Sequence, residues 1–426
     1  MKEYNSLMSN SKRVIVIPDG FADNPIESLD NRTPMQAAST PTLDAWAPRG
    51  VQGRSHNVPL TLSPGSDVAT LALLGYDPLE SYTGRAPLEA AAQGVELGPN
   101  DWAWRCNLVC LENDVMKSFT AGHITSEDAA ELLADLQANV APKWRELAPE
   151  FGGTVEFRPG VSYRNVAIFR PDSDDRPFPF SAETETFPPH DYIDRSIADV
   201  YPQGPGSDKV RELMAACADY LRTARTNLRR VAQGKLPATD CWLWGQGKRP
   251  TMESFSQKFN WGKGAMITAV DLLRGIANLL GWSVINVPGA TGYVDTNFAG
   301  KGESAAKALD EYDIVVVHVE APDESGHEGS VEKKIRSLED IDQKTLPPIL
   351  EKLQTFPDWR LLISPDHPTP ISIKTHSRGA VPWMIIGSDV KGDGMTTYDE
   401  TTGAASERFF LKGYELMEYF LRGKLQ

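Results

Sequence analysis

Short apolar runs recur along the chain, and amphipathic stretches separate them. Apolar runs of four to seven residues are typical of strands buried on both faces of a parallel sheet. The runs with this pattern are residues 14–17 (VIVI), 283–287 (SVINV), 313–319 (DIVVVHV), 361–364 (LLIS) and 381–386 (VPWMII). Helical periodicity lies between them, at residues 265–280, 332–353 and 408–421. This alternation predicts an α/β fold, with an open, mostly parallel sheet and helices on both faces.

The middle of the chain has a different pattern. An amphipathic helix is predicted first, then two strands around Pro159-Gly160, a long surface loop and a long helix. These elements are expected at residues 126–140, 154–158, 163–170, 171–207 and 208–231. We therefore predict two domains: a discontinuous core of residues 12–105 and 238–426, and an inserted, smaller α+β cap domain of residues 106–237.

Composition narrows the classes of partner. The 426 residues include 41% apolar and 24% charged residues, as in a globular protein, and the net charge is −15. An acidic chain disfavours nucleic acid or an anionic membrane as a partner. No apolar run reaches the roughly 18 residues that a membrane span requires. The first ten residues, MKEYNSLMSN, contain no apolar signal core, which predicts a cytoplasmic location.

The four cysteines carry no predicted chemistry. Their spacing matches neither a zinc motif nor a redox pair. Buried, small apolar side chains are therefore expected at Cys106, Cys110, Cys217 and Cys241.

Acidic and imidazole side chains follow three of the predicted strands. Parallel strands end at one edge of an open sheet, where ligands bind, so these side chains are expected to meet there. The side chains are Asp19, Asp323, His327, Asp366, His367 and His376, which include three of the chain's seven histidines. Mixed oxygen and nitrogen donors suit Mn²⁺ or Zn²⁺, and oxygen-rich sets suit Mg²⁺. The pattern predicts a site for divalent metal ions.

A candidate nucleophile precedes an apolar helical run. Ser66 follows the turn Pro64-Gly65 and opens the segment DVATLALLG. Free amides and the positive dipole end at a helix N-terminus favour a phosphate or an alkoxide. A serine here is also a common helix cap, so its spacing alone leaves both roles open.

Long motifs allow a comparison with a known family. In chain order they are PDG, PGSDVATLALLGYDP, YTGRAPLEA, WRCNLVCLEN, TAGHITSEDAAELL, PGATGYVDTNFAGK, HVEAPDESGHEG and SPDHPTP…KTHSRGAVPW. From about Arg13 to the C-terminus, the chain resembles the archaeal-type, cofactor-independent phosphoglycerate mutases of the alkaline phosphatase superfamily. It is most similar to their bacterial subgroup. The resemblance implies an alkaline-phosphatase-like core with a cap.

The resemblance also implies a metal centre and a reaction. Two divalent ions (Mn²⁺, Mg²⁺ or Zn²⁺) would be bound, and 2,3-bisphosphoglycerate would not be needed. One ion would be held by Asp323, His327 and His376, and the other by Asp19, Asp366, His367 and the oxygen of Ser66. A phosphoserine at Ser66 would carry the phosphoryl group between 3-phosphoglycerate and 2-phosphoglycerate, an isomerase reaction of glycolysis and gluconeogenesis.

Two segments depart from the family pattern. The usual Gly-Asp-Gly opening is Pro18-Asp19-Gly20 here, which keeps the acidic ligand and loses one backbone N–H. The arginine-rich run Asp-Arg-Arg-Ala-Gly-Arg is replaced by residues 118–123 (SFTAGH). The second change concerns the identity of the substrate rather than the phosphoryl chemistry.

A small phosphorylated substrate requires cationic side chains. Guanidinium groups suit carboxylate and phosphate geometry. The candidates for substrate binding are Arg85, Arg105, His123, Arg164, Lys258 and Lys263. The other three histidines are expected to be structural: His56 and His190 as surface residues, and His318 as a strand residue near the site.

Other functions remain compatible with the sequence. Members of the bacterial subgroup have been proposed to be homoserine kinase-like, and a metabolite phosphotransferase or a metal-dependent phosphatase would use the same fold. A nucleotide-binding P-loop is absent, because Gly245-Gln246-Gly247-Lys248 is followed by arginine. A non-catalytic binding module is the remaining alternative, and loss of metal ligands would be its signature.

Overall fold

The chain folds into two compact units. The structure, a computed structural model, describes residues 11–181 and 183–424. One unit comprises the residues up to 82 together with those from 251 onward, and the other comprises residues 83–250. The segment MKEYNSLMSN, on which the predicted location depends, lies outside the described residues.

The first unit is built on an eight-stranded sheet with the order β13-β2-β12-β11-β1-β10-β8-β9. The run from β11 to β9 is parallel, with Val14 of β1 opposite both Val315 and Leu361. The bounds are β1 (Ser11–Pro18), β2 (Val51–Ser55), β8 (Gly264–Ile267), β9 (Ser283–Ile285), β10 (Ile314–Val319), β11 (Asp358–Ile363), β12 (Val381–Gly387) and β13 (Phe409–Phe410). The predicted α/β fold with a mostly parallel sheet is confirmed.

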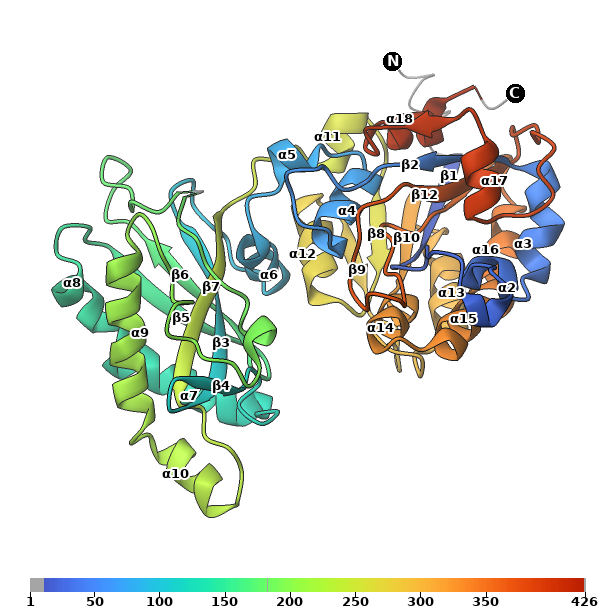
Figure 1. Cartoon of the computed structure of the whole chain (residues 1–426). Helices are drawn as coiled ribbons and strands as arrows, with labels where there is room; N and C mark the ends of the chain where they lie inside the picture. The colour runs from blue at the N-terminus through green and yellow to red at the C-terminus, as the bar shows by residue number, and fades with distance from the viewer. Residues whose placement is uncertain (1–10, 182, 425–426) are drawn as a thin grey trace. The chain divides into compact units, whose positions relative to one another are not determined.

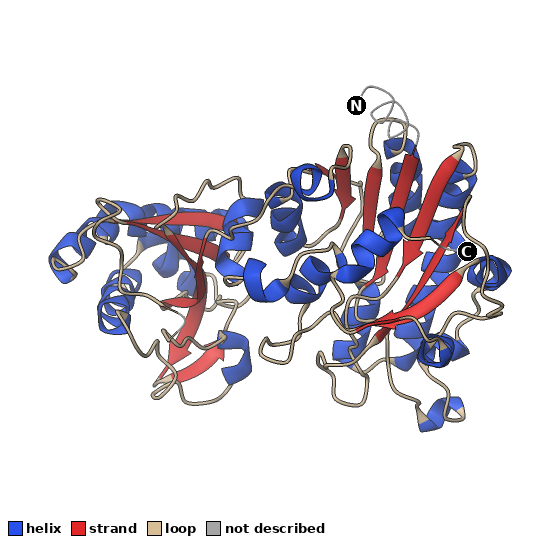
Figure 2. Ribbon diagram, turned by 90° about the horizontal axis from the view of Figure 1, so that it is seen from above, coloured by secondary structure: helices blue, strands red, loops and turns tan. Residues whose placement is uncertain are grey.

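Helices cover both faces of this sheet (Figure 2). They are α2 (Pro34–Ala37), α3 (Pro41–Trp46), α4 (Ser66–Leu73), α5 (Pro78–Ser81), α11 (Phe255–Phe259), α12 (Asp271–Leu279), α13 (Phe298–Ala308), α14 (Ala321–Glu328), α15 (Val331–Asp340), α16 (Leu346–Leu353), α17 (Glu400–Ala405) and α18 (Glu415–Arg422). Shorter turns are η1 (Glu27–Leu29), η2 (Ala47–Arg49) and the π-turn η5 (Ile341–Thr345). Alternate residues of a strand point to opposite faces, so cover on both faces explains the unbroken apolar runs at residues 14–17 of β1 and 314–317 of β10.

Three predicted elements of this unit need correction. Residues 408–421 were expected to be helical, but Phe409–Phe410 forms strand β13 and helix α18 begins at Glu415. Residues 265–280 were expected to be helical throughout, but Gly264–Ile267 forms strand β8 beside β10, and the helix begins at Asp271. Residues 381–386 were expected to form a parallel strand, but β12 is antiparallel to β11. The connection from β11 to β12 contains no helix, and a parallel neighbour requires a crossover of about a dozen residues or more, usually helical.

The second unit is an antiparallel α+β domain (Figure 1). Its strands are β3 (Trp102–Glu112), β4 (Val115–Ser118), β5 (Thr154–Val161), β6 (Arg164–Arg170) and β7 (Asp240–Lys248). Its helices are α6 (Arg85–Ala92), α7 (Ser126–Asn139), α8 (Trp144–Leu147), α9 (Ser207–Leu221) and α10 (Arg225–Ala232), with short turns η3 (Ala141–Lys143) and η4 (Pro189–Tyr192). The predicted helix at residues 208–231 is therefore divided between α9 and α10.

The limits of this unit differ from the predicted cap of residues 106–237. Strands β3 and β7 pair with each other, which brings residues 102–112 and 240–248 into the smaller sheet. Helix α6 packs on both strands, so the unit begins at residue 83. The apolar run at 102–111 resembles a core strand in sequence, and only its pairing assigns it to this sheet.

Three of the four cysteines meet in the core of the second unit. All four are buried, as predicted. The spacing of the cysteines does not predict a pair, but the Sγ atoms of Cys106 and Cys241 lie 3.0 Å apart because β3 and β7 are adjacent. Cys217 of α9 also contacts Cys241, and hydrogen bonds from both neighbours lower the pKa of Cys241 to about 5.

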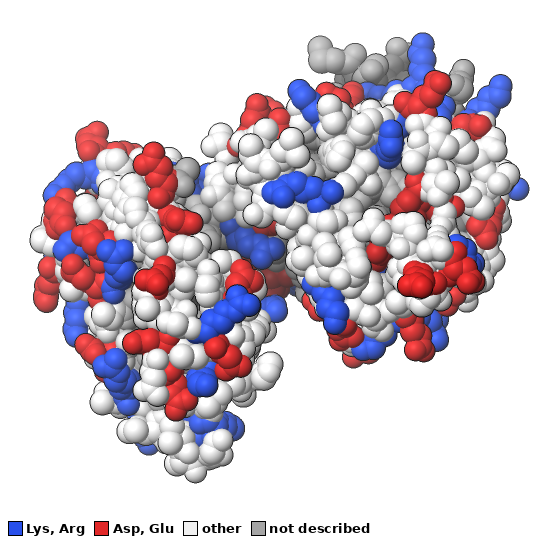
Figure 3. All heavy atoms as spheres, viewed as in Figure 1, with Lys and Arg blue, Asp and Glu red and all other residues white. Residues whose placement is uncertain are grey.

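Acidic and basic side chains are mixed over the face shown in Figure 3. The net charge of −15 is therefore not gathered into one acidic region on that face. No helix in the described part of the chain combines the length and apolar character needed to cross a membrane.

A partly buried carboxylate predicts a pH-dependent stability. Burial raises the pKa of Glu400 to about 7, although its oxygens accept hydrogen bonds from the Thr33 hydroxyl (2.6 Å) and the Asp23 amide (3.1 Å). A raised folded pKa stabilises the protein below the unfolded value near 4.5, and this contribution is lost as pH rises towards 7. Relative to Glu400→Gln, the wild type should lose about 2 kcal/mol between pH 4.5 and 7.5 in urea unfolding. Glu407→Gln, at an exposed position, should show no such trend.

Candidate active site

The predicted acidic and imidazole side chains meet at one edge of the larger sheet. Strands β1 and β10 run parallel and end in register at Pro18 and Val319, and β11 ends beside them. Asp19 follows β1 directly. Asp323 and His327 lie on α14 after β10, and the loop after β11 carries Asp366 and His367. The topology therefore explains why ligand-type residues that are distant in sequence form one cluster.

The first group consists of Asp323, His327 and His376. The Nε2 atoms of the two histidines are 3.0 Å apart, and they lie 3.1 and 3.5 Å from the carboxylate oxygens of Asp323. The spacing of four residues on α14 places Asp323 and His327 on one face. Backbone carbonyls orient both rings through Nδ1: that of Lys374 at 3.1 Å from His327 and that of Pro64 at 3.2 Å from His376. Each Nε2 thus faces the carboxylate.

The second group consists of Asp19, Asp366, His367 and Ser66. The Nε2 atom of His367 lies 3.4 Å from Asp19 Oδ1 and 3.5 Å from Asp366 Oδ2. Ser66 Oγ lies 3.2 Å from both Asp19 Oδ2 and His367 Nε2. His367 also approaches the first group, because its ligand atom clusters with those of Asp323 and His376. The two groups are neighbours that share an imidazole.

The donor set fits divalent cations. Asp19, Asp323 and Asp366 are almost fully buried, and Oδ2 of Asp366 has no hydrogen-bond partner among the described residues. Burial and the negative charges of Asp366 and Asp323 raise the pKa of Asp19 well above its usual range. A hydrogen bond donated to Asp323 raises the pKa of His327 to about 9. A proton on His327 and a metal ion are therefore alternative counter-charges for these carboxylates.

Ser66 is the first residue of helix α4, behind Gly65. The next seven residues are buried, so the core of the unit fixes the start of the helix. The first amides of a helix have no acceptor within it and point along the axis with the positive dipole end. An anionic group attached to Ser66 Oγ would meet these amides.

Two neighbours of the ligands were not among the predicted site residues. The Thr369 hydroxyl donates to Asp323 and lies 3.3 Å from His367 Nδ1, so it contacts both groups. His318, predicted as a strand residue near the site, places Nε2 2.9 Å from Asp19 Oδ2. Burial lowers the pKa of His318 to about 3, which keeps the ring neutral. The run PDHPTP could have drawn attention to Thr369, whereas His318 looks like any strand residue.

Three predicted arginines gather within the second unit. Arg105 is buried, forms an ion pair with Glu89 (2.9 Å) and lies over the Trp244 ring, 4.1 Å from its centroid. Burial lowers the pKa of Arg105, and the positive charges of Arg85 and Arg164 lower it further. Arg85 and Arg164 thus lie near enough to Arg105 for their charges to act on it.

The structure also gives the positions of three further histidines, none of which lies in the metal-ligand groups. His123 is exposed in the turn after β4, apart from the strands that carry Arg105 and Arg164. His190, expected at the surface, is exposed but packs against Trp244 and Phe119. Burial lowers the pKa of His190, as do the charges of Arg105 and Arg85. His56, also expected at the surface, is partly covered by Phe409.

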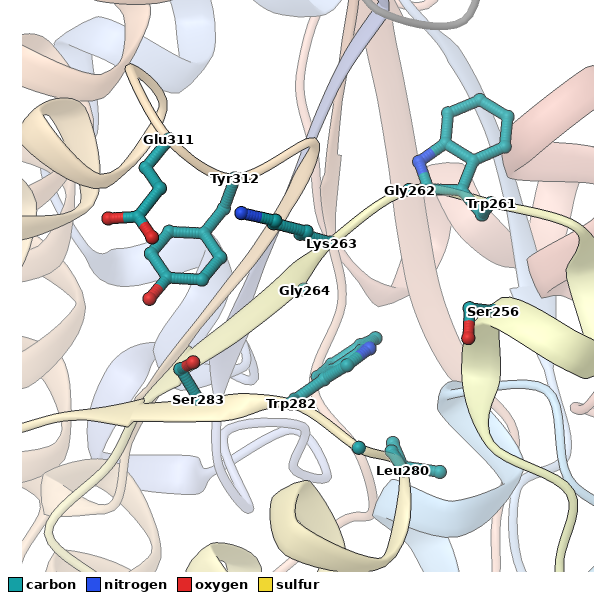
Figure 4. A pocket seen from close by; sticks show the side chains of 11 residues that line it. Ser256, Trp261, Gly262, Lys263, Gly264, Leu280, Trp282, Ser283, Glu311 and Tyr312 are labelled. Atoms are coloured by element: carbon teal, nitrogen blue, oxygen red, sulfur yellow. The ribbon is translucent and has the colours of Figure 1, made fainter. Parts of the chain in front are cut away.

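Lys258 and Lys263 do not lie beside the metal-type cluster, which consists of the first and second groups together. Lys263 precedes β8, and its carbonyl accepts from Asp313 just before β10, so it lies at the edge where the parallel strands begin. There it lines a hollow of about 520 Å³ with Trp261, Trp282 and Tyr312 (Figure 4). Lys258 lies over the ring of Tyr76, beyond the far end of α4 from Ser66. The strand length and the helix length separate both lysines from the cluster.

Fold and site together define a class of protein. Its members are α/β proteins in which a serine at a helix N-terminus meets carboxylate and imidazole donors at the carboxyl edge of a mostly parallel sheet. Known proteins identify the family within this class. A model of the 2,3-bisphosphoglycerate-independent phosphoglycerate mutase family matches residues 47–227.

Curated relatives extend the match over nearly the whole chain. The 2,3-bisphosphoglycerate-independent phosphoglycerate mutase of Methanosarcina acetivorans is 44% identical over 409 residues, or 95% of this chain and 98% of the relative. A probable enzyme of the same name from Geobacter sulfurreducens is 42% identical, over 96% of this chain and 99% of the relative. The chain belongs to the 2,3-bisphosphoglycerate-independent phosphoglycerate mutase family.

Solved structures agree with the fold. The PH0037 protein from Pyrococcus horikoshii superposes with a TM-score of 0.75 at 26% identity, over 97% of each chain. A cofactor-independent phosphoglycerate mutase from Thermoplasma acidophilum has the same fold, with a TM-score of 0.63 at 24% identity, over 97% of this chain and 100% of that one.

Proposed function

We propose that this protein interconverts 3-phosphoglycerate and 2-phosphoglycerate through a phosphoserine at Ser66, without 2,3-bisphosphoglycerate. It would be an isomerase of glycolysis and gluconeogenesis, with a cytoplasmic location. One observation carries the proposal: Ser66 Oγ lies 3.2 Å from both Asp19 and His367, at the start of α4. The names of relatives that are more than 40% identical over nearly the full chain support the choice of reaction.

The chain's own residues account for the two transfers. The bond from Ser66 Oγ to phosphorus forms while the bond to the 3-oxygen of glycerate breaks, and the reverse transfer places the group on the 2-oxygen. The two groups of donors around Asp323 and Asp19 would hold the divalent ions. Such ions supply positive charge that activates a hydroxyl and neutralises phosphoryl oxygens. The first-turn amides of α4 would face the phosphate on Ser66.

The substrate carboxylate requires its own cations. Arg85, Arg105 and Arg164 form the proposed anion site of the second unit, with Glu89 and Trp244 fixing Arg105. His123 stays a predicted contact on the basis of its motif. We leave Lys258 and Lys263 out of the substrate site because the larger sheet and α4 separate them from the metal-type cluster.

A coupled enolase assay tests the reaction directly. With Mn²⁺ present and 2,3-bisphosphoglycerate absent, the protein should convert 3-phosphoglycerate at a steady rate. A folded, metal-loaded protein that leaves 3-phosphoglycerate unchanged would contradict the proposal. Homoserine with phosphorylated donors would then be the next substrate to test.

Substitution of Arg164 tests the anion site. Arg164 is exposed and lies over the Tyr163 ring, so Arg164→Ala should fold normally. Loss of a charge-assisted hydrogen bond to the substrate costs about 1.5–3 kcal/mol, which predicts an increase in KM of about 10- to 100-fold with little change in kcat. Arg158→Ala on the neighbouring strand β5 is the matched control and should leave KM unchanged. An unchanged KM for Arg164→Ala would remove this residue from the site.

A further inference from the structure

His318 lies inside the metal-type cluster although it is not one of the predicted ligands. It is the last residue but one of β10 and pairs in register with Ile17 of β1, two residues before Asp19. Its side chain is completely buried. The sheet itself, rather than a loop, therefore places an imidazole beside the acidic residue that follows β1.

The hydrogen bonds of His318 fix its tautomer. Nε2 lies 2.9 Å from Asp19 Oδ2, and Nδ1 lies 3.3 Å from the hydroxyl of Thr268. When a bound cation keeps Asp19 ionised, its carboxylate can only accept, so Nε2 carries the hydrogen and Nδ1 accepts from Thr268. The backbone carbonyl of His318 also accepts from the buried ammonium of Lys301 at 3.0 Å. Asp19 and Thr268 therefore hold the ring, and Lys301 holds the backbone of the same residue.

These contacts determine how Asp19 presents its oxygens. Oδ2 is engaged by His318 and also lies 3.2 Å from Ser66 Oγ, whereas Oδ1 faces His367 at 3.4 Å. A carboxylate with one oxygen tied in this way cannot rotate freely about its last torsion. The neutral imidazole of His318 fixes the orientation of the Asp19 carboxylate without adding charge to the cluster.

We infer that His318 is a positioning residue that orients Asp19 towards a divalent ion held with Asp366 and His367. The inference rests on the metal centre of the proposed function. Partners that orient a metal ligand typically contribute 10- to 100-fold in metal affinity. The effect should be local, because Asp323, His327 and His376 have their own orienting contacts.

Three variants separate orientation from packing. His318→Leu fills the space without a donor, His318→Gln offers an amide N–H to Asp19, and Thr268→Val removes the partner of Nδ1. Each full-length protein is freed of metal with a chelator and titrated with Mn²⁺ in a calorimeter, after circular dichroism has shown that it is folded. His318→Leu should weaken one of two Mn²⁺ sites by about 10- to 100-fold and spare the other. His318→Gln should recover most of the loss, and Thr268→Val should lie between them.

The outcomes separate this inference from the proposed function. Two sites of wild-type affinity in folded His318→Leu would overturn the positioning role, as would a His318→Gln variant as weak as the leucine variant. Equal weakening of both sites would show a general packing effect and would also overturn it. A wild-type protein that binds no Mn²⁺ would remove the metal centre itself, and this inference with it. Recovery of the His318→Leu rate at high Mn²⁺ is the expected companion result.

Discussion

Ser66→Ala is expected to reduce phosphoglycerate mutase activity by about 10⁴-fold or more, as removal of a nucleophile does in other covalent mechanisms. The hydroxyl of Ser66 lies 3.2 Å from both Asp19 and His367. Alanine has no oxygen at this position that could attack the phosphorus atom. The helix should persist, because Ser66 is its first residue and the core fixes the seven that follow. The coupled enolase assay measures the loss, and intact-protein mass spectrometry of substrate-quenched enzyme should detect one phosphate in the wild type only.

The control for this experiment is Ser256→Ala. Ser256 is exposed on α11, at the hollow that also contains Lys263, so its substitution should leave the rate and the phosphorylation unchanged. A Ser66→Ala enzyme with substantial activity would contradict the phosphoserine route. A phosphorylated Ser66→Ala protein would assign the nucleophile to another residue.

Much of the site could be predicted because topology and chemistry agree there. Parallel strands ending at one edge bring Asp19, Asp323 and Asp366 together whatever the details of the loops. The same reasoning predicts the α/β class from buried, unbroken apolar strands. Neither step requires side-chain conformations, so both survive errors of a few residues at strand ends. The roles of the three aspartates as metal ligands stay a prediction until bound ions are measured.

The remaining features depend on pairing that a linear pattern does not encode. The run at residues 102–111 has the apolar character of a core strand, but its partner is β7, so it belongs to the smaller sheet. The direction of β12 depends on a connection without a helix. Lys263 is a predicted substrate contact, yet it precedes β8 and therefore lies at the edge opposite the cluster. The sequence predicts that His318 lies near the site, but its contact with Asp19 becomes evident only when β1 and β10 are aligned.

Substitution of Asp366 is expected to have opposite effects on activity and on the stability of the metal-free protein. Oδ1 of Asp366 accepts from the amides of Gly20 (3.1 Å) and His367 (2.9 Å), and Oδ2 has no hydrogen-bond partner among the described residues. Asparagine retains the first oxygen and replaces the second with an N–H₂ group that can donate towards Asp19. Burial and Asp323 still raise the pKa of Asp19, but the contribution from the charge of Asp366 is removed.

Metal-free Asp366→Asn should therefore be more stable than metal-free wild type by about 1–2 kcal/mol in chemical unfolding, because a buried like-charge pair becomes a hydrogen bond. With Mn²⁺ present the order should reverse, since the wild type gains binding free energy that the variant lacks. Activity should fall by about 10³-fold or more, because one of the charges that holds an ion beside Ser66 is gone. Unfolding with and without a chelator, bound-metal analysis and the coupled assay measure these three effects.

Asp342→Asn is the matched control for a buried carboxylate outside the cluster. Asp342 is buried and accepts from the backbone amides of Thr42 and Leu43 at the start of α3. Its substitution should change stability by a similar amount with and without Mn²⁺ and leave activity intact.

If Asp366→Asn retained both ions and a normal rate, Asp366 would not be a ligand. If metal-free Asp366→Asn were less stable than the wild type, the carboxylate repulsion would not be the dominant interaction at this edge of the sheet. The combination of a more stable metal-free protein and a nearly inactive enzyme is what a site built to hold cations requires, because its residues are arranged for the bound ion and not for the stability of the empty fold.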